Sequence, residues 1–575
     1  MHGVSTTSES DASSCYDSPA MVPAKLVVQS ALAGLYGGLV IALLVALLNP
    51  GGGLGAGLSI VLAVTAIYTV AAGLLWPALY GALRFFASRK LRLAWINPRY
   101  ILIFHAANMT VILTSAWTTL SRSRGAIAPG ARDHLELTCW SLSFAWLIAV
   151  IVLVVPRLGR RTTPILTGMG VALLALIAPA AMSRGAPDPL STAVSRGPRG
   201  GAPTRHLLLL NFDGADLGTI LALEAEGKLP AFSRLREEGT YGRLRSVRPC
   251  TAAVTRSTLL TGRLPYSHGV RGARGRRLLG WGPSIEVVPM RLGFDWLLGP
   301  LFETRSRTIE DRSTLALWDI VSRLGGAGRK AGWRVDLDDP AAVTRFSGPG
   351  GAGVGGGTLR EILDPDAARA ADPDAHSRLA VITRGLEADA EVTDSFERLI
   401  AECPAGVTAI SYPGLDAMAH TFLRHARPEL FGDVTAAEAE SYGDVLQRYY
   451  RRMDGIVGRA ANACGGEGFL FVTSSHGIDP APLGRRILSL LTGGDSPSGI
   501  HERGPHGFLF ARGPNLRAGE TFGKGSLLDV APTALYALEL PIASDMDGRL
   551  LTEAFTRRYI ARHPVTVIDS YEPQR

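Results

Sequence analysis

The pattern of apolar and polar residues divides the chain into two parts that meet near residue 183. Before this point apolar residues form long runs, and five of them approach the ~20 residues that a helix needs to cross a bilayer. The predicted membrane segments are residues 26–48, 57–80, 100–120, 135–155 and 164–182. A buried core helix can imitate one such run. Five in succession, separated by short loops, predict a five-helix transmembrane domain over residues 26–183.

Basic residues are unevenly shared among the loops between these segments, which predicts the orientation of the domain. The loops after the second and fourth segments carry Arg84, Arg89, Lys90, Arg92, Arg99, Arg157, Arg160 and Arg161. The first loop has no charge, and the third carries both signs, which weakens the argument without reversing it. We therefore expect an integral membrane protein with a cytoplasmic N-terminus. An odd number of spans then places the C-terminal part on the periplasmic or extracellular face.

After a Pro-, Gly-, Ser- and Arg-rich linker at residues 184–204, short apolar runs alternate with amphipathic segments. Strands are predicted at HLLLLNF, YGRLRSV, VTAISY, GFLFVTS and GFLFARG, and helices at GTILALEAEGKLPAFSRLREEG (with a turn inside), RSTLLTG, LALWDIVSRLG, 376–403 and 436–463. This alternation predicts an α/β/α sandwich with a largely parallel central sheet over residues 205–555.

The remaining boundaries follow from composition. Residues 1–25 are polar and predict a disordered cytoplasmic tail, and residues 556–575 a C-terminal tail. A cap or insertion is expected at about residues 272–400, including the glycine-rich stretch 345–357.

The five cysteines form no CxxC spacing, which favours buried or free thiols. The net charge of +8 comes partly from the basic loops, and no nucleic-acid-binding motif accompanies it, so we expect no nucleic-acid partner.

Acidic and histidine residues stand where several apolar runs end. Asp213 follows LLLLNF, and His476 follows FLFVTSS, each directly before a glycine. Open α/β folds place their sites at the carboxyl ends of parallel strands, so both side chains are expected at one edge of the sheet. For Asp213 the alternative is a turn-forming residue.

A second group follows farther along the chain. Asp416 and His420 have the i, i+4 spacing that puts two side chains on one face of a helix, within reach of one ion. An isolated Asp-x3-His pair is a weak motif, and a capping Asp on a surface helix is the alternative. His501 lies in the irregular segment SGIHERGPHG. Together these contexts predict a metal centre.

These contexts belong to a longer series of motifs: FDGAD, EGKLPAFSRLREEGTYGRL, LLTGRLPYSHGV, LALWDIVSRLG, YPGLDAMAH, SSHG, HERGPHGFLFARGP and LLDVAPTALYALELPIASDMDGRLL. In order and spacing they resemble the alkaline phosphatase superfamily, in particular its type I phosphodiesterase/nucleotide pyrophosphatase-like branch, over about residues 205–555. The resemblance implies an alkaline-phosphatase-like fold and two divalent ions, usually zinc, beside the phosphoryl group. It also implies a Thr or Ser nucleophile between the ions.

Carried over to this chain, the resemblance assigns Asp416, His420 and His501 to one ion. It assigns Asp213, His476 and a second Asp to the other. Two ions would activate the nucleophile, bind the phosphoryl oxygens and offset the charge of an in-line displacement.

The chain departs from the family pattern at two places. Ser475 stands where a metal-binding Asp belongs, and an uncharged serine is a poor ligand, so the second ion is expected to bind weakly. Asp479 could compensate, although a turn-capping role is favoured. The usual nucleophile position falls on Ala252; Thr251, one residue earlier, is the predicted nucleophile, and Cys250 is a less favoured substitute.

We therefore expect a membrane-anchored, metal-dependent phosphodiesterase, phosphatase or phosphotransferase. A catalytically degenerate member that binds a phosphorylated ligand or envelope partner without turnover is the alternative. Five spans followed by such a domain also resemble lipid-linked phosphoglycerol and phosphoethanolamine transferases, so a lipid- or envelope-linked phosphoester is a reasonable substrate. A sulfatase is a lesser alternative: Arg256 matches that motif, but Ala252 and Val254 depart from it. His268 and His506 are expected to be structural.

Overall fold

The computed structural model describes residues 21–49, 54–86, 98–154, 201–290, 299–333, 356–371, 375–484, 486–487, 498–503 and 505–573. The chain divides into two compact units, which are described separately below. The helical unit comprises Met1–Pro189 and Gly275–Arg305. The α/β unit comprises Leu190–Arg274 and Ser306–Arg575.

The helical unit contains long helices in the first four predicted membrane segments: α1 (Met21–Leu48), α2 (Leu54–Phe86), α3 (Pro98–Arg122) and α4 (Pro129–Val154). The fifth predicted segment, 164–182, lies outside the described residues. Within the described residues, Ser30–Leu48 and Leu58–Leu75 are long and apolar enough to cross a membrane. A core helix or a signal sequence can meet the same criterion, so the five-span arrangement stays a prediction.

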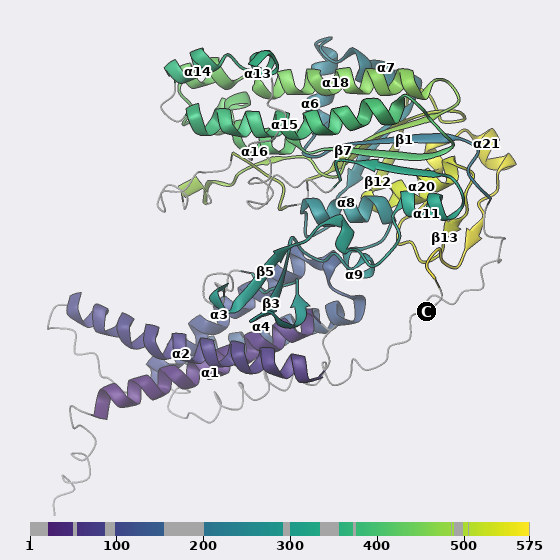
Figure 1. The fold of residues 1–575 in the computed structure, drawn as a ribbon. Helices are drawn as coiled ribbons and strands as arrows, with labels where there is room; N and C mark the ends of the chain where they lie inside the picture. Colours follow the sequence, from purple (N-terminus) through teal and green to yellow (C-terminus); the bar gives the residue numbers. More distant parts are fainter. Residues whose placement is uncertain are drawn as a thin grey trace, which may run out of the picture. The chain divides into compact units, whose positions relative to one another are not determined.

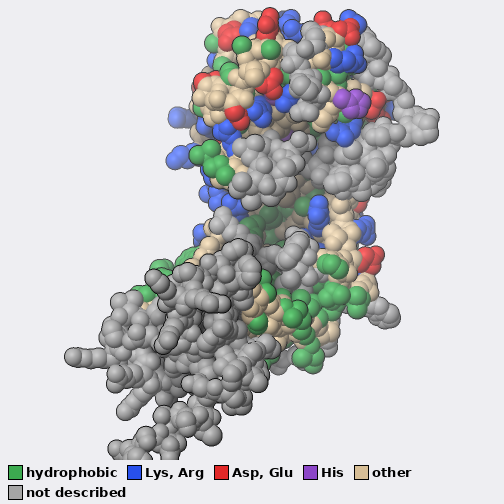
Figure 2. Space-filling model, turned by 90° about the vertical axis from the view of Figure 1, so that its left-hand side faces the viewer, with side chains coloured by type: hydrophobic (Ala, Val, Ile, Leu, Met, Phe, Trp, Pro, Cys, Tyr) green, Lys and Arg blue, Asp and Glu red, His purple; other side chains and the backbone are tan. Residues whose placement is uncertain are grey.

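One face of α4 is apolar and exposed. Leu137, Trp140, Phe144, Leu147 and Ile151 follow one another at intervals of three or four residues, and each is 47% or more exposed. This spacing places them on one side of the helix. In Figure 2 hydrophobic side chains gather on the helical part of the molecule, while charged side chains of both signs cover the α/β part. A continuous apolar stripe of this kind is typical of a face that contacts lipid or another protein.

A small sheet from the later part of the sequence also belongs to the helical unit. Its strands are β3 (Arg274–Leu278), β4 (Trp281–Ile285) and β5 (Phe302–Ser306), in the order β4-β3-β5. Ile285, Val287 and Phe302 are buried in the same hydrophobic cluster as the helices. The Asn49 side chain fastens this segment: its Nδ2 donates to the Val287 carbonyl (2.7 Å), and its Oδ1 accepts the backbone N–H of Glu286 (3.0 Å).

The α/β unit is built on a seven-stranded sheet in the order β12-β2-β11-β8-β1-β7-β6. The strands are β1 (His206–Phe212), β2 (Thr240–Arg245), β6 (Ala327–Ala331), β7 (Gly406–Tyr412), β8 (Phe469–Ser474), β11 (Gly507–Arg512) and β12 (Glu520–Ser526). Only β11 runs antiparallel to its neighbours, and the other described pairs in this sheet are parallel. The predicted, largely parallel sheet is therefore confirmed.

Both faces of the sheet are buried, as the continuous apolar runs of the central strands require. Along β1, Leu208 and Leu210 point into one hydrophobic cluster, and Leu207 and Leu209 into the other. The first cluster is covered by α6 (Leu217–Ala225), α7 (Pro230–Glu238), α15 (Ala375–Ile400), α16 (Gly414–Ala426) and α18 (Val445–Cys464), and the second by α8 (Ala252–Thr261), α11 (Leu317–Arg323) and α20 (Val530–Ala537). Figure 1 shows these two helical layers on opposite sides of the strands.

The sequence predicted five of the seven strands and most of these helices. The predicted helix 436–463 is divided into α17 (Ala436–Tyr442) and α18. Strands β6 and β12 were missed, because AGRKA and ETFGKGS are short, polar and glycine-containing, and only their neighbours in the sheet make them strands. The glycine-rich stretch 345–357 lies almost wholly outside the described residues.

Candidate metal centre

Three predicted site residues, Asp213, Asp416 and His476, come after the carboxyl ends of β1, β7 and β8, which are adjacent in the sheet. Asp213 follows β1 directly, and its backbone N–H donates to the Tyr412 carbonyl at the end of β7 (3.2 Å). Gly214 has a φ of +74° and packs against Asp416 so closely that a Cβ would lie 2.6 Å from Asp416 Oδ1. Only glycine tolerates both conditions, so Gly214 allows the β1 end to meet the helix after β7.

Asp416 and His420 both lie on α16, one turn apart, as the i, i+4 spacing predicted. His420 Nε2 is 3.7 Å from Asp416 Oδ2. His501, which directly follows β10 (Gly499–Ile500), completes the group: its Nε2 is 3.9 Å from the same carboxylate oxygen. The ligand atoms of all three residues lie within 4.8 Å of one another. Ligand atoms around a tetrahedral zinc are ~3.3 Å apart, so a small contraction would bring these three to coordination distance.

The imidazoles of this group are held by backbone carbonyls. His420 Nδ1 bonds to the Gly499 carbonyl (2.7 Å) and His501 Nδ1 to the Cys250 carbonyl (2.8 Å). A carbonyl only accepts, so each Nδ1 carries the proton and each Nε2 keeps its lone pair for a ligand. Both Nε2 atoms therefore present a lone pair beside the Asp416 carboxylate.

The Asp416 carboxylate is buried and only partly satisfied by protein groups. Its Oδ1 has no hydrogen-bond partner among the described residues. Burial acts to raise the pKa of Asp416, but the neighbouring imidazoles of His420, His501 and His476 outweigh it and hold the pKa well below its ordinary value. A buried, ionised carboxylate with an orphaned oxygen and two oriented imidazoles is a donor set that fits a divalent cation.

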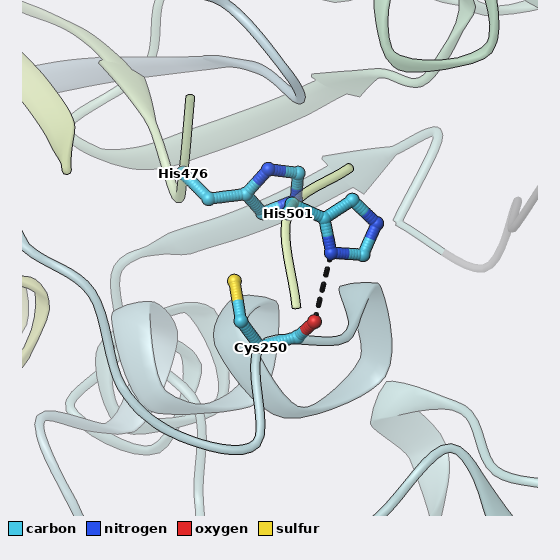
Figure 3. Close-up of side chains that lie close together, drawn as sticks. All are labelled: Cys250, His476 and His501. Carbon is cyan, nitrogen blue, oxygen red and sulfur yellow. Dashed lines mark hydrogen bonds between the residues drawn. The ribbon is translucent and has the colours of Figure 1, made fainter. Parts of the chain in front are cut away.

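His476 lies against His501, with ring centroids 4.4 Å apart. Figure 3 shows His476, His501 and the Cys250 side chain gathered around the start of α8, and their ligand atoms form a second group within 4.8 Å. His476 is fully buried, and its Nε2 has no hydrogen-bond partner in the described part of the chain. Burial, with His501 beside it, lowers the pKa of His476, so this imidazole is neutral near pH 7. From the sequence, Cys250 was considered only as a less favoured substitute for the nucleophile.

Thr251 is the N-cap residue of α8, directly after Cys250, but its side chain does not cap the helix. Its Oγ1 is buried and has no hydrogen-bond partner among the described residues. A threonine at this position ordinarily accepts a backbone N–H. Thr251 Oγ1 thus makes no cap hydrogen bond, and it lies one residue from the Cys250 carbonyl to which His501 is bonded.

Asp213 is placed differently from the prediction. Its side chain is ion-paired with Arg256 on α8, and it belongs to no group of three or more metal-binding side chains among the described residues. Ser475 Oγ donates to Asp213 Oδ1 (3.0 Å). The structure therefore brings Asp416, His420, His501 and His476 together and ties Asp213 to a cation of the protein itself. The ion pair could not be predicted, because the sequence pointed to Arg256 only through the disfavoured sulfatase motif.

The remaining candidates have structural surroundings. Asp479 lies in the two-residue strand β9 (Asp479–Pro480), where it pairs with Ile500, and not in either metal-binding group. His268 is fully buried, with Nε2 3.0 Å from Thr258 Oγ1 and Nδ1 accepting the Val270 N–H. The described cysteines (139, 250, 403 and 464) are all free, as expected.

A buried carboxylate and histidines thus lie together at the carboxyl edge of a largely parallel sheet, which is where open α/β folds place their sites. The family model "Type I phosphodiesterase / nucleotide pyrophosphatase" matches residues 207–492, about half of the chain. Over this region the chain belongs to the type I phosphodiesterase / nucleotide pyrophosphatase family, whose members are phosphoester hydrolases.

Comparisons with individual proteins show more distant similarity. Curated relatives include 2,3-bisphosphoglycerate-independent phosphoglycerate mutases from two strains of Cereibacter sphaeroides, each 29% identical over 182 residues. The match covers 30% of this chain and 29% of each mutase, so the chain spans less than a third of their length. Solved structures include murine ectonucleotide pyrophosphatase / phosphodiesterase 5 in complex with AMP (13% identity, TM-score 0.36, 61% of this chain and 100% of that chain). The human protein matches with 12% identity, TM-score 0.35 and coverage of 60% and 97%.

Proposed function

We propose that this protein is a membrane-anchored, metal-dependent phosphoester hydrolase or phosphotransferase whose reaction takes place at the carboxyl edge of the α/β sheet. One observation carries the proposal. His420 and His501 have their Nδ1 atoms fixed on backbone carbonyls, and their Nε2 atoms lie beside a buried carboxylate whose second oxygen has no partner. Proteins rarely leave a buried carboxylate oxygen without a partner unless a ligand completes it.

In this proposal Asp416, His420 and His501 hold one divalent ion, for which zinc suits the mixed nitrogen and oxygen donors. When bound, the ion supplies Lewis-acid stabilisation to phosphoryl oxygens and favours the deprotonated form of a nearby hydroxyl. The protein itself fixes the tautomers of His420 and His501 and keeps the Asp416 carboxylate ionised and buried from water.

Thr251 Oγ1 is the proposed nucleophile. It forms a bond to phosphorus while the bond to the leaving alcohol breaks, and its proton ends on that alcohol. Water, or an acceptor alcohol, then displaces the threonine oxygen and regenerates the hydroxyl. Two observations support this role: Thr251 Oγ1 has no hydrogen-bond partner among the described residues, and Thr251 lies at the start of α8. Because the chain is similar to phosphoglycerate mutases over 182 residues, transfer of the phosphoryl group to an acceptor alcohol is proposed as well as hydrolysis.

Hydrolysis of bis-p-nitrophenyl phosphate by the purified full-length protein tests the proposal. Activity is expected to fall with a chelator and to return with zinc, and Asp416→Ala is expected to lose more than about 100-fold. His425→Gln is the matched control, because His425 is a buried histidine on the same helix that belongs to neither metal-binding group. Activity that persists in the chelator, or that survives in Asp416→Ala, would refute metal-dependent catalysis.

The second candidate is a degenerate family member that binds a phosphorylated ligand without turnover. The Asp213–Arg256 ion pair and Ser475 favour it, because they remove one of the two ion sites that the family pattern implies. Protein that binds zinc and a phosphoester but hydrolyses neither bis-p-nitrophenyl phosphate nor a lipid-linked phosphodiester in vesicles would establish this candidate instead.

The membrane part of the proposal is supported by α1 and α2 and by the exposed apolar stripe on α4. The basic loops favour a cytoplasmic N-terminus and an α/β unit on the periplasmic or extracellular face. A lipid- or envelope-linked phosphoester would suit that location. Reporter fusions at the C-terminus test the topology: a reporter that is active only outside the cytoplasm is expected to be active, and an inactive one would reverse the orientation.

A further inference from the structure

Asp213, which the family resemblance assigns to a second ion, forms a buried ion pair with Arg256. The two side chains are 1% and 3% exposed. Arg256 Nε donates to Asp213 Oδ2 (2.6 Å), and a terminal guanidinium nitrogen lies 2.5 Å from the same oxygen. The other oxygen, Oδ1, accepts from Asn211 Nδ2 (2.9 Å) and Ser475 Oγ (3.0 Å). Donors of the protein itself therefore engage both oxygens of the carboxylate.

Ser475 is part of the same arrangement. Its Oγ donates to Asp213 and accepts from Thr255 Oγ1 (3.1 Å). A carboxylate at position 475 would lie against the Asp213 carboxylate, and the two charges would repel each other unless a cation lay between them or one carboxylate took up a proton. With serine there, one negative charge remains, and the single charge of Arg256 neutralises it. Ser475 and Arg256 together thus keep the buried site neutral.

His501 imposes a second limit on the number of ions. It is common to both metal-binding groups, Asp416–His420–His501 and Cys250–His476–His501. Because its Nδ1 is bonded to the Cys250 carbonyl, only Nε2 can coordinate, and one nitrogen lone pair serves one ion. The two groups therefore cannot both be complete at the same time.

We infer that this centre holds one divalent ion, and that the Arg256 guanidinium permanently occupies the position of the second. This inference deepens the proposed function and rests on it. A guanidinium keeps its charge at every pH of interest and cannot be removed by a chelator. The positive charge on the Asp213 side of the centre is therefore fixed, and only the charge on the Asp416 side depends on metal supply.

Zinc content of the purified full-length protein, saturated with zinc and then freed of excess, tests the inference. The wild type is expected to hold one zinc per chain and His501→Ala none. Asp213→Asn/Arg256→Met removes the ion pair as a unit and is expected still to hold one. Arg256→Ala/Ser475→Asp restores a second carboxylate and removes the guanidinium, so it is expected to hold two. Arg236→Ala is the matched control: Arg236 also pairs with a buried acid, Glu224, but on α7 and α6.

The outcomes separate the inference from the proposed function. Two zinc ions in the wild type, falling to one in Asp213→Asn/Arg256→Met, would overturn the single-ion centre while leaving metal-dependent catalysis intact. No zinc in the wild type would overturn the proposed function itself. Thermal unfolding, compared with that of Arg236→Ala, shows whether Arg256→Ala/Ser475→Asp folds. If it does not fold, the zinc contents of the wild type and of Asp213→Asn/Arg256→Met decide the question.

Discussion

Asp389 is a buried acid on α15 that holds the first turn of α16, the helix that carries the proposed ligands Asp416 and His420. Its Oδ1 accepts the Gly414 N–H (3.0 Å), and its Oδ2 accepts the Tyr449 hydroxyl (2.6 Å). Burial raises the pKa of Asp389 from 3.8 to about 6, despite these two hydrogen bonds. The folded protein therefore binds this proton more tightly than the unfolded chain does.

The sign of the pH dependence follows from this difference. The contribution of Asp389 to the free energy of unfolding is fully present below pH 3.8 and is lost as the pH rises through about 6. The total loss is about 3 kcal/mol, of which about 1.4 kcal/mol falls between pH 5 and pH 8. Asp389→Asn removes the ionisation but keeps both contacts, because the amide oxygen can accept the Gly414 N–H and the amide nitrogen can donate to Tyr449 Oη.

Urea unfolding of the full-length protein in a chelator at pH 5 and pH 8 measures this effect. Relative to the wild type, Asp389→Asn is expected to be more stable at pH 8 than at pH 5 by about 1.4 kcal/mol. Asp394→Asn removes an exposed carboxylate from the same helix and serves as the control. A stability difference between Asp389→Asn and the wild type that is the same at both pH values would refute the assignment of a desolvated, late-ionising Asp389.

Three further changes have defined consequences. Thr251→Ala should abolish turnover while leaving zinc content unchanged, and Thr251→Ser should restore it; full activity in Thr251→Ala would exclude this nucleophile. Gly214→Ala should weaken zinc binding, because the new Cβ would lie 2.6 Å from Asp416 Oδ1. An unchanged zinc affinity would show that the close packing of Gly214 against Asp416 is not required for zinc binding. Asn49→Ala removes three hydrogen bonds to residues 286–287 and should increase protease cleavage there, whereas a cleavage rate equal to that of the wild type would count against this attachment.

The sequence predicted the central sheet because β1, β7 and β8 are continuous apolar runs that end in chemically distinctive residues. It also predicted the Asp416–His420 pair, since the i, i+4 spacing of a helix is a local property. His501 was found only through family resemblance, because its segment is irregular and its position depends on the Gly499 and Cys250 carbonyls. Contacts of this kind join distant parts of the chain and produce no periodic pattern of residues in the sequence.

The second half of the site shows the limit of motif transfer. Ser475 predicted a weakened ion site, and the structure adds the ion pair of Asp213 with Arg256, which lies 219 residues before Ser475 in the chain. Whether Asp213 binds a metal or a guanidinium depends on which side chain of α8 faces the end of β1. The sequence motif shows that an arginine is present, but only the packing of α8 shows where it points.

An anomalous difference map from crystals of the zinc-saturated full-length protein tests the metal centre most directly. We predict one zinc peak, coordinated by a carboxylate oxygen of Asp416 and by Nε2 of His420 and His501, with Arg256 still paired to Asp213. A peak between Asp213 and Ser475, or the absence of a peak beside Asp416, would contradict a single-ion centre at this position.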